Sequence, residues 1–90
     1  MSEQEKEAKM EFPCDYGIKA MGLTTDDFDA VVVGLVRQFV DDIKEGAVSS
    51  KQSSSGKFTS VTVDFKATSK EQLDNIYQAL TDNQQVKYIL

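Results

Sequence analysis

Polar and hydrophobic residues alternate after Pro13, and this alternation predicts a first strand. Residues 16–20 place Tyr16, Ile18 and Ala20 on one side and polar or small residues on the other. A period of two is typical of a strand with one buried face. Because proline has no N–H donor, Pro13 fits at the first residue of a strand or just before one. We expect the strand to end near Gly22.

A longer apolar stripe follows at the spacing of an α-helix. Its members recur at intervals of three and four residues, namely Phe28, Val31, Val32, Leu35, Val36, Phe39, Val40 and Ile43. This spacing predicts a helix of about four turns with one buried face. Thr24, with Asp27 three residues later, fits a capping pattern at its start. Gly46 suits its C-terminus, where glycine adopts a left-handed backbone easily.

The second half of the chain predicts a hairpin, a second helix and a closing strand. Residues 47–52 predict a weak edge strand, and the composition of Ser53–Gly56 predicts a turn. Apolar and polar residues alternate again within residues 58–67, which predicts the next strand. Ser69 and Gln72 make a second capping pattern before an amphipathic helix that contains Leu73, Ile76, Tyr77 and Leu80. Residues 86–90 form the last strand.

The order strand-helix-strand-strand-helix-strand predicts an α+β fold of the ferredoxin-like βαββαβ type. This ACT-like two-layer sandwich has a four-stranded antiparallel sheet with both helices on one face. We expect residues 12–90 to form the domain and residues 1–11 to be a flexible acidic and polar leader. The helix-covered face is built from Ile18, Val61, Val63, Phe65 and Val86. The open face is predicted to be polar and without aromatics, with Asp15, Gly17, Lys19, Ser60, Thr62, Asp64 and Lys66.

Composition excludes several classes of function. The chain has no His and one Cys, so it offers no Cys/His zinc site, no disulfide framework and no Ser-His-Asp triad. We therefore expect no catalytic residues, no cofactor and no metal. The net charge of −5 disfavours nucleic-acid binding, and the predicted open face has no aromatic residue on which a base could stack. The longest apolar stretch, residues 30–36, is too short to span a membrane, and without a signal-peptide pattern a cytoplasmic location is expected.

Two binding surfaces are predicted. Backbone N–H groups in the turn Gly22, Leu23 and Thr24 suit a small anionic ligand, although an ordinary strand-to-helix turn explains the same residues. A protein partner surface is predicted from Lys19, Thr62 and Lys66 on the open face and Ser54, Ser55 and Gly56 in the hairpin loop. Because an open sheet exposes its edges, we also expect self-association as a homodimer.

Several motifs together resemble the YbeD family of small bacterial proteins, whose function is not established. They are Phe12-Pro13, Lys19–Gly22, Ser54–Phe58 with Ser60-Val61, Ala67-Thr68, Glu71-Gln72, Ile76-Tyr77, Leu80 and the strand Val86–Leu90. The resemblance covers about residues 12–90. It implies a ferredoxin-like sandwich close to ACT regulatory domains, and a link to lipoate metabolism from the gene surroundings of family members.

Two functions follow as hypotheses. The first is a non-enzymatic regulatory or adaptor domain that binds a protein partner, which includes a second copy of itself. The alternative is an ACT-type sensor that binds an amino acid or a short acyl acid, and the resemblance places that ligand at Gly22, Leu23 and Thr24.

Overall fold

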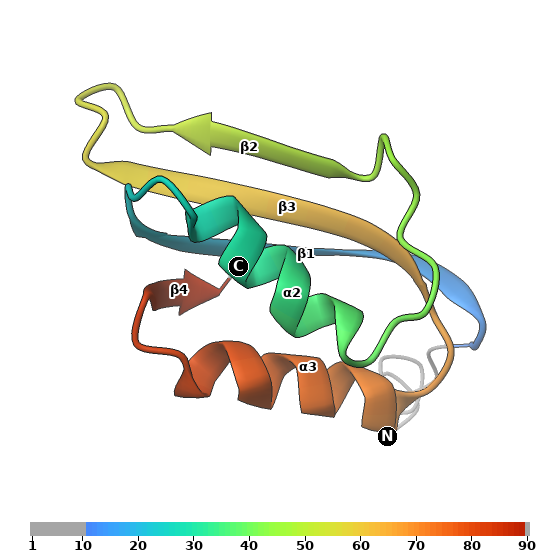
Figure 1. The fold of residues 1–90 in the computed structure, drawn as a ribbon. Helices are drawn as coiled ribbons and strands as arrows, with labels where there is room; N and C mark the ends of the chain where they lie inside the picture. Colours follow the sequence, from blue (N-terminus) through green and yellow to red (C-terminus); the bar gives the residue numbers. More distant parts are fainter. Residues whose placement is uncertain (1–10, 90) are drawn as a thin grey trace, which may run out of the picture.

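The computed structural model describes residues 11–89 and shows the predicted order of elements (Figure 1). These are β1 (Cys14–Leu23), α2 (Phe28–Arg37), β2 (Val48–Gln52), β3 (Phe58–Ala67), α3 (Lys70–Asp82) and β4 (Val86–Ile89). The strands form one antiparallel sheet in the order β2-β3-β1-β4. The predicted ferredoxin-like class is therefore confirmed. Apart from Glu11, the predicted leader lies outside the described residues.

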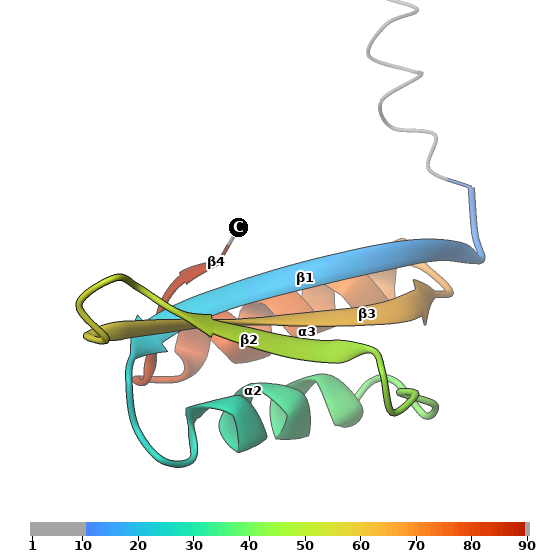
Figure 2. The ribbon, with the colours of Figure 1, turned by 90° about the horizontal axis from the view of Figure 1, so that it is seen from above.

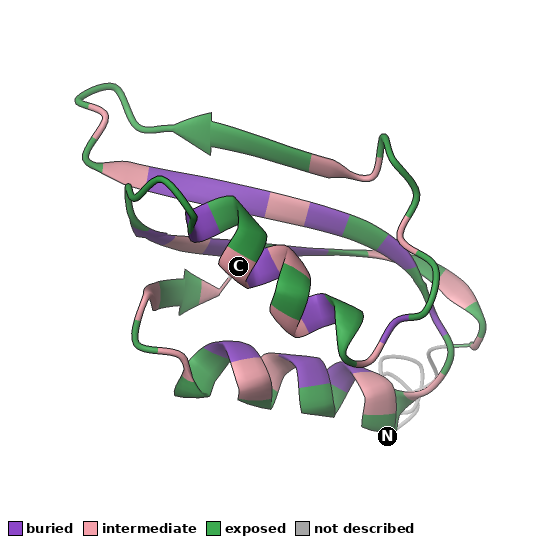
Figure 3. Ribbon diagram, viewed as in Figure 1, coloured by how far each residue is buried: buried purple, intermediate pink, exposed green. Residues whose placement is uncertain are grey.

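Both helices lie on the same side of the sheet (Figure 2). The core between the two layers combines the inward residues of β1 and β3 with one face of each helix (Figure 3). Its largest fully buried side chains are Phe28, Ile18, Ile76, Leu80, Val32, Val36, Val61 and Val63. The inward residues predicted for the sheet all pack in or against this core. No element within residues 11–89 covers the opposite side of the sheet.

The long pair β1–β3 forms the centre of the sheet. Its register runs from Cys14 opposite Ala67 to Leu23 opposite Phe58. As predicted, β1 begins directly after Pro13, which follows a cis peptide bond. It ends at Leu23, one residue past Gly22, so the predicted turn residues Gly22 and Leu23 belong to the strand.

The first helix is shorter than the apolar stripe predicts. It ends at Arg37 and does not continue to Ile43. The N–H groups of Phe39 and Val40 both donate hydrogen bonds to the Val36 carbonyl oxygen. A continuing helix would also place Asp41 and its acidic neighbour at the negative end of the helix dipole, where carboxylates are unfavourable. Val40 nevertheless stays buried, at 6% exposed, although it is not helical. Val31 of the predicted stripe is only half-buried and lies outside the core.

Both predicted ends of this helix need correction. The residue that precedes the first turn is Asp27, and its side chain makes no capping hydrogen bond. The Thr24 hydroxyl instead lies 2.7 Å from the Thr59 hydroxyl on β3. Gly46 lies in the loop between α2 and β2, well beyond the helix. A tertiary contact thus takes the place of the predicted cap at the start, whereas the Gln38 N–H bonds locally to the Leu35 and Val36 carbonyl oxygens at the end.

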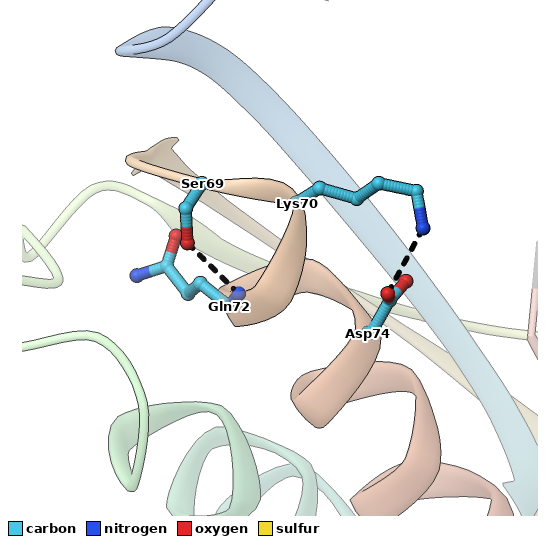
Figure 4. Close-up of polar contacts among 4 residues, drawn as sticks. All are labelled: Ser69, Lys70, Gln72 and Asp74. Atoms are coloured by element: carbon cyan, nitrogen blue, oxygen red, sulfur yellow. Dashed lines mark hydrogen bonds and ion pairs between the residues drawn. The ribbon is translucent and has the colours of Figure 1, made fainter. Parts of the chain in front are cut away.

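The second half of the chain follows its local signals closely. Gly56 occupies the hairpin loop with φ of +79°, in the left-handed region that favours glycine. The Ser69 hydroxyl accepts a hydrogen bond of 3.0 Å from the Gln72 N–H and caps α3 (Figure 4). The Gln72 side chain extends the cap, accepting from the Thr68 N–H and donating to the Phe39 carbonyl oxygen.

Candidate functional site

The open face of the sheet is organised in cross-strand rows that the register defines. Residues directly opposite each other on antiparallel strands point to the same face. The end row pairs Leu23 with Phe58. The next row runs Tyr88, Met21, Ser60 and Lys51, and the third runs Lys19, Thr62 and Ser49. The last two rows pair Gly17 with Asp64 and Asp15 with Lys66.

The hydrophobic side chains of this face gather in the first two rows. We call Met21, Leu23, Phe58 and Tyr88 the apolar patch. Tyr88 is 61% exposed and Leu23 is 45% exposed, although both are large hydrophobic side chains. None of the four belongs to the buried core or packs against it. A contiguous exposed apolar patch on a small domain is typical of a binding surface.

The prediction that the open face carries no aromatic residue was wrong. Phe58 and Tyr88 both lie on it, at one end, whereas the predicted polar residues occupy the remainder. Phe58 shares its even-numbered spacing with Ser60 and Thr62, so the alternation in the sequence contained the signal. The outward position of Tyr88 was not predicted, because it depends on a register shift between Met21 and Gly22. This shift places Val86 on the core side and Tyr88 on the open face.

A shallow hollow of about 450 Å³ lies within this end of the face. Its lining residues are Leu23, Lys57, Phe58, Lys87 and Tyr88. The Lys57 Nζ lies 5.6 Å from the centroid of the Phe58 ring, within cation–π range. The hollow therefore combines two aromatic side chains with two cations.

The predicted partner residues lie in the third row of the face, in its last row and in the hairpin loop. Lys19 and Thr62 lie opposite each other in the third row, next to the apolar patch. Lys66 lies at the far end, with its Nζ 3.6 Å from Asp15 Oδ1. The loop residues Ser54, Ser55 and Gly56 directly precede Lys57 and Phe58, so this loop borders the patch. The Ser55 hydroxyl accepts from the Lys57 N–H and helps to hold the loop.

The structure places the predicted ligand residues Gly22, Leu23 and Thr24 in a different setting. A Cβ at Gly22 would overlap the Gln85 carbonyl oxygen and lie 2.7 Å from the Phe28 ring. The Thr24 N–H already donates to the Lys57 carbonyl oxygen at 2.9 Å. Close packing of Phe28 accounts for the glycine, and this N–H is not free for an anion. The geometry at these residues therefore does not favour an effector site.

A larger groove of about 800 Å³ lies between the loop after α2 and the ends of β1 and β3, and residues from both faces of the sheet line it. Phe39, Val40 and Phe65 contribute its apolar lining, and Asp41 and Asp64 are among its carboxylates. Within residues 11–89, no buried side-chain nitrogen or oxygen is left without a hydrogen-bond partner. No unsatisfied group therefore points to a ligand in this groove.

A tyrosine pair lies beside this groove. The Tyr16 and Tyr77 hydroxyl oxygens lie 2.8 Å apart. Burial, followed by the contact with Tyr16, raises the pKa of Tyr77 to about 12. A catalytic base or nucleophile requires a shift in the opposite direction. Across the described residues, no three Cys, Asp or Glu side chains cluster in a way that would hold a metal ion.

Comparison with known proteins places the chain among relatives of similar length. The family model described as "Protein of unknown function (DUF493)" matches residues 7–90. The chain belongs to the DUF493 family. Its curated relatives carry the name UPF0250, and the predicted kinship with the YbeD family is thereby confirmed.

Two of these DUF493 relatives show how complete the similarity is. A UPF0250 protein of Paraburkholderia phytofirmans is 45% identical over 84 residues, which cover 93% of this chain and 94% of the relative. A UPF0250 protein of Neisseria gonorrhoeae is 41% identical over 91 residues and matches both chains in full. Neither name states an activity or a ligand.

A solved structure supports the fold of this DUF493 protein. The solution structure of protein HP0495 from H. pylori aligns with a TM-score of 0.72 and 17% sequence identity, covering 100% of this chain and 94% of the other. At this identity the likeness shows the fold alone. In the described part of the chain, no helix is long and apolar enough to cross a membrane.

Proposed function

We propose that this DUF493 protein is a non-enzymatic cytoplasmic adaptor or regulatory domain that binds another protein through the apolar patch. The observation that carries the proposal is the exposure of Leu23 and Tyr88, at 45% and 61%, on a sheet face that no described element covers. Burying such side chains contributes favourable free energy to association, and aromatic residues are enriched among those that dominate interfaces.

Rigidity of the surface supports the same function. Three of the patch residues come from β1 and β3, which pair along the whole of β1. Strand-borne side chains are held in place before a partner arrives, so less conformational entropy is lost on binding. The hairpin loop at Ser54–Gly56 adds polar groups at the border of the patch, as is usual for the rim of an interface.

The non-enzymatic part of the proposal is supported by the chemistry of the described side chains. The raised pKa of Tyr77 keeps its hydroxyl protonated at neutral pH. Catalysis needs a nucleophile or a base held by an orienting partner. The chain has no histidine, and Cys14 is its one cysteine.

Site-specific photo-crosslinking in the bacterial cell tests the proposal. A photoreactive phenylalanine analogue replaces Tyr88 in the full chain, and a matched position on the helix-covered side, the exposed Glu71 of α3, serves as the control. We expect one recurrent covalent adduct from position 88 that is absent from position 71. The adduct should weaken when Phe58→Ser is added, because this substitution removes part of the patch.

Identical adducts from positions 71 and 88, or none from position 88, would contradict the proposal. The family resemblance further predicts that the captured protein acts in lipoate metabolism, and mass identification of the adduct tests this link directly.

The effector hypothesis has its own test. A ligand that binds only the folded chain stabilises it by about 2.7 kcal/mol at a hundredfold excess over its Kd. Thermal unfolding in the presence of single amino acids and short acyl acids measures this effect. A reproducible stabilisation by one of these compounds would favour the sensor over the adaptor.

A further inference from the structure

Charge is distributed unevenly over the open face. The chain carries a net charge of −5, yet lysines surround the apolar patch. We call these residues the lysine rim: Lys19, Lys51, Lys57 and Lys87. Lys57 and Lys87 line the hollow itself. Lys51 and Lys19 project from the rows at the patch and next to it. On the described strands, the carboxylates of this face are those of Asp15 and Asp64, in the two rows farthest from the patch.

The lysine rim is not neutralised by ion pairs within residues 11–89. The ion pairs found there join Lys44 to Asp42, Lys66 to Asp15, and Lys70 to Asp74. Lys57 instead faces the Phe58 ring, and this cation–π contact leaves its positive charge intact. One end of an acidic protein therefore presents a cationic and apolar surface.

We infer that the apolar patch and the lysine rim together bind an acidic segment of a protein partner that carries an aromatic or aliphatic anchor side chain. This inference rests on the proposed function and specifies the partner's chemistry. The anchor would fill the hollow between Leu23, Phe58 and Tyr88, while carboxylates beside it meet the lysines. Complementary charge speeds encounter and selects partners, and the buried anchor supplies most of the affinity.

Nucleic acid is the strongest competing occupant, because aromatic residues and lysines on an open sheet also stack and hold bases. An extended phosphate chain that crosses this face would meet Asp15 and Asp64 in the far rows. The net charge of −5 adds repulsion at long range. A short acidic segment confined to the patch avoids both effects, so the observations favour a protein.

A synthetic acidic peptide tests the inference. The probe is a short peptide of Asp and Glu residues with one central Trp. Because this chain contains no Trp, the fluorescence of the probe alone reports binding. Comparison peptides replace the acidic residues with Ser, or the Trp with Ser. We expect the full chain to bind the acidic Trp peptide at least about tenfold more tightly than either comparison peptide, a difference of about 1.4 kcal/mol. Added salt should weaken this binding.

Two double variants separate the surface from overall charge. Lys57→Glu with Lys87→Glu alters the lysine rim, and Lys44→Glu with Lys70→Glu makes the same change of net charge elsewhere. We expect about a tenfold loss of peptide affinity in the first and little change in the second. Thermal unfolding of each variant checks that the fold is intact. Equal losses in both would overturn the inference, because only net charge would then matter.

Other occupants give different results. Tighter binding of a single-stranded oligothymidylate or of anionic phospholipid vesicles than of the acidic peptide would overturn the inference. Self-association that Tyr88→Ser abolishes would do the same, and would assign the patch to a second copy. If position 88 captures a protein in the cell but no acidic peptide binds, the proposed function stands and the inferred chemistry of its partner is wrong.

Discussion

The hydroxyl oxygens of Tyr16 and Tyr77 lie 2.8 Å apart and join β1 to α3. The Tyr16 ring also lies against Phe65 on β3, with centroids 5.9 Å apart. The hydroxyl contact between Tyr16 and Tyr77 brings polar groups from strand and helix together at the border of the core. Burial is the larger cause of the raised pKa of Tyr77, about 12, and the hydrogen bond to Tyr16 adds to it.

The raised pKa predicts a loss of stability in alkali. Between pH 10 and about 12 the folded chain retains a Tyr77 proton that the unfolded chain has released. The contribution to the free energy of unfolding is therefore fully present below pH 10 and falls as the pH rises toward 12. Urea unfolding followed by circular dichroism across this range measures the decline.

Tyr77→Phe is the matched control for this effect. It removes the titrating hydroxyl, so its free energy of unfolding should decline less steeply above pH 10. At neutral pH the variant should lose about 0.5–1.5 kcal/mol, the net value of one hydrogen bond. An equally steep alkaline decline in both proteins would assign it to other groups.

Gly22→Ala is expected to destabilise the fold. The added methyl would overlap the Gln85 carbonyl oxygen and lie 2.7 Å and 2.9 Å from two atoms of the Phe28 ring. Forcing extra volume into a packed site costs about 1–3 kcal/mol. Chemical denaturation of the variant measures this loss.

Gly34→Ala is the opposite case and the control. It lies inside α2, where a Cβ would meet nothing within 4 Å. Alanine favours a helix over glycine by about 0.5–1 kcal/mol, so this variant should be more stable than the natural chain. A cost at Gly34 as large as that at Gly22 would show that the outer face of α2 is occupied.

The sequence predicted the fold because each element carried its own local signal. The alternation on β3 and the cap of α3 at Ser69 needed no knowledge of distant contacts. The end of α2 was different. Apolar spacing identifies which side chains are buried, and Val40 is buried, but it does not require a helical backbone there. The competing bond from Gln72 to the Phe39 carbonyl oxygen comes from a distant helix, so no local pattern reveals it.

The candidate site was only partly predictable for the same reason. The positions of Lys19 and Thr62 on the open face follow from simple alternation. The outward direction of Tyr88 depends on a register shift between β1 and β4, which is a property of strand pairing. A period of two counted along β4 alone places Tyr88 on the same side as Val86, and the structure separates them.

Loss of the α3 cap should weaken the fold by a moderate amount. The Ser69 hydroxyl accepts from the Gln72 N–H, which otherwise has no partner in the first turn of the helix. Ser69→Ala should cost about 1 kcal/mol, whereas Ser69→Asp should retain most of the stability because its carboxylate can accept the same bond. Urea midpoints of the two variants give the comparison. Equal losses would mean that the bond contributes little.

The two leucines Leu80 and Leu35 should respond differently to truncation, although both belong to apolar stripes. Leu80 is fully buried, and Leu80→Ala should cost about 2–5 kcal/mol, the range for deeply buried leucines. Leu35 is only partly buried, packed against the core rather than within it. Leu35→Ala should therefore cost about 1–2 kcal/mol, nearer to the centre of the range for point mutants. Denaturant unfolding of both variants under one condition decides the point, since equal costs would place Leu35 as deep in the core as Leu80.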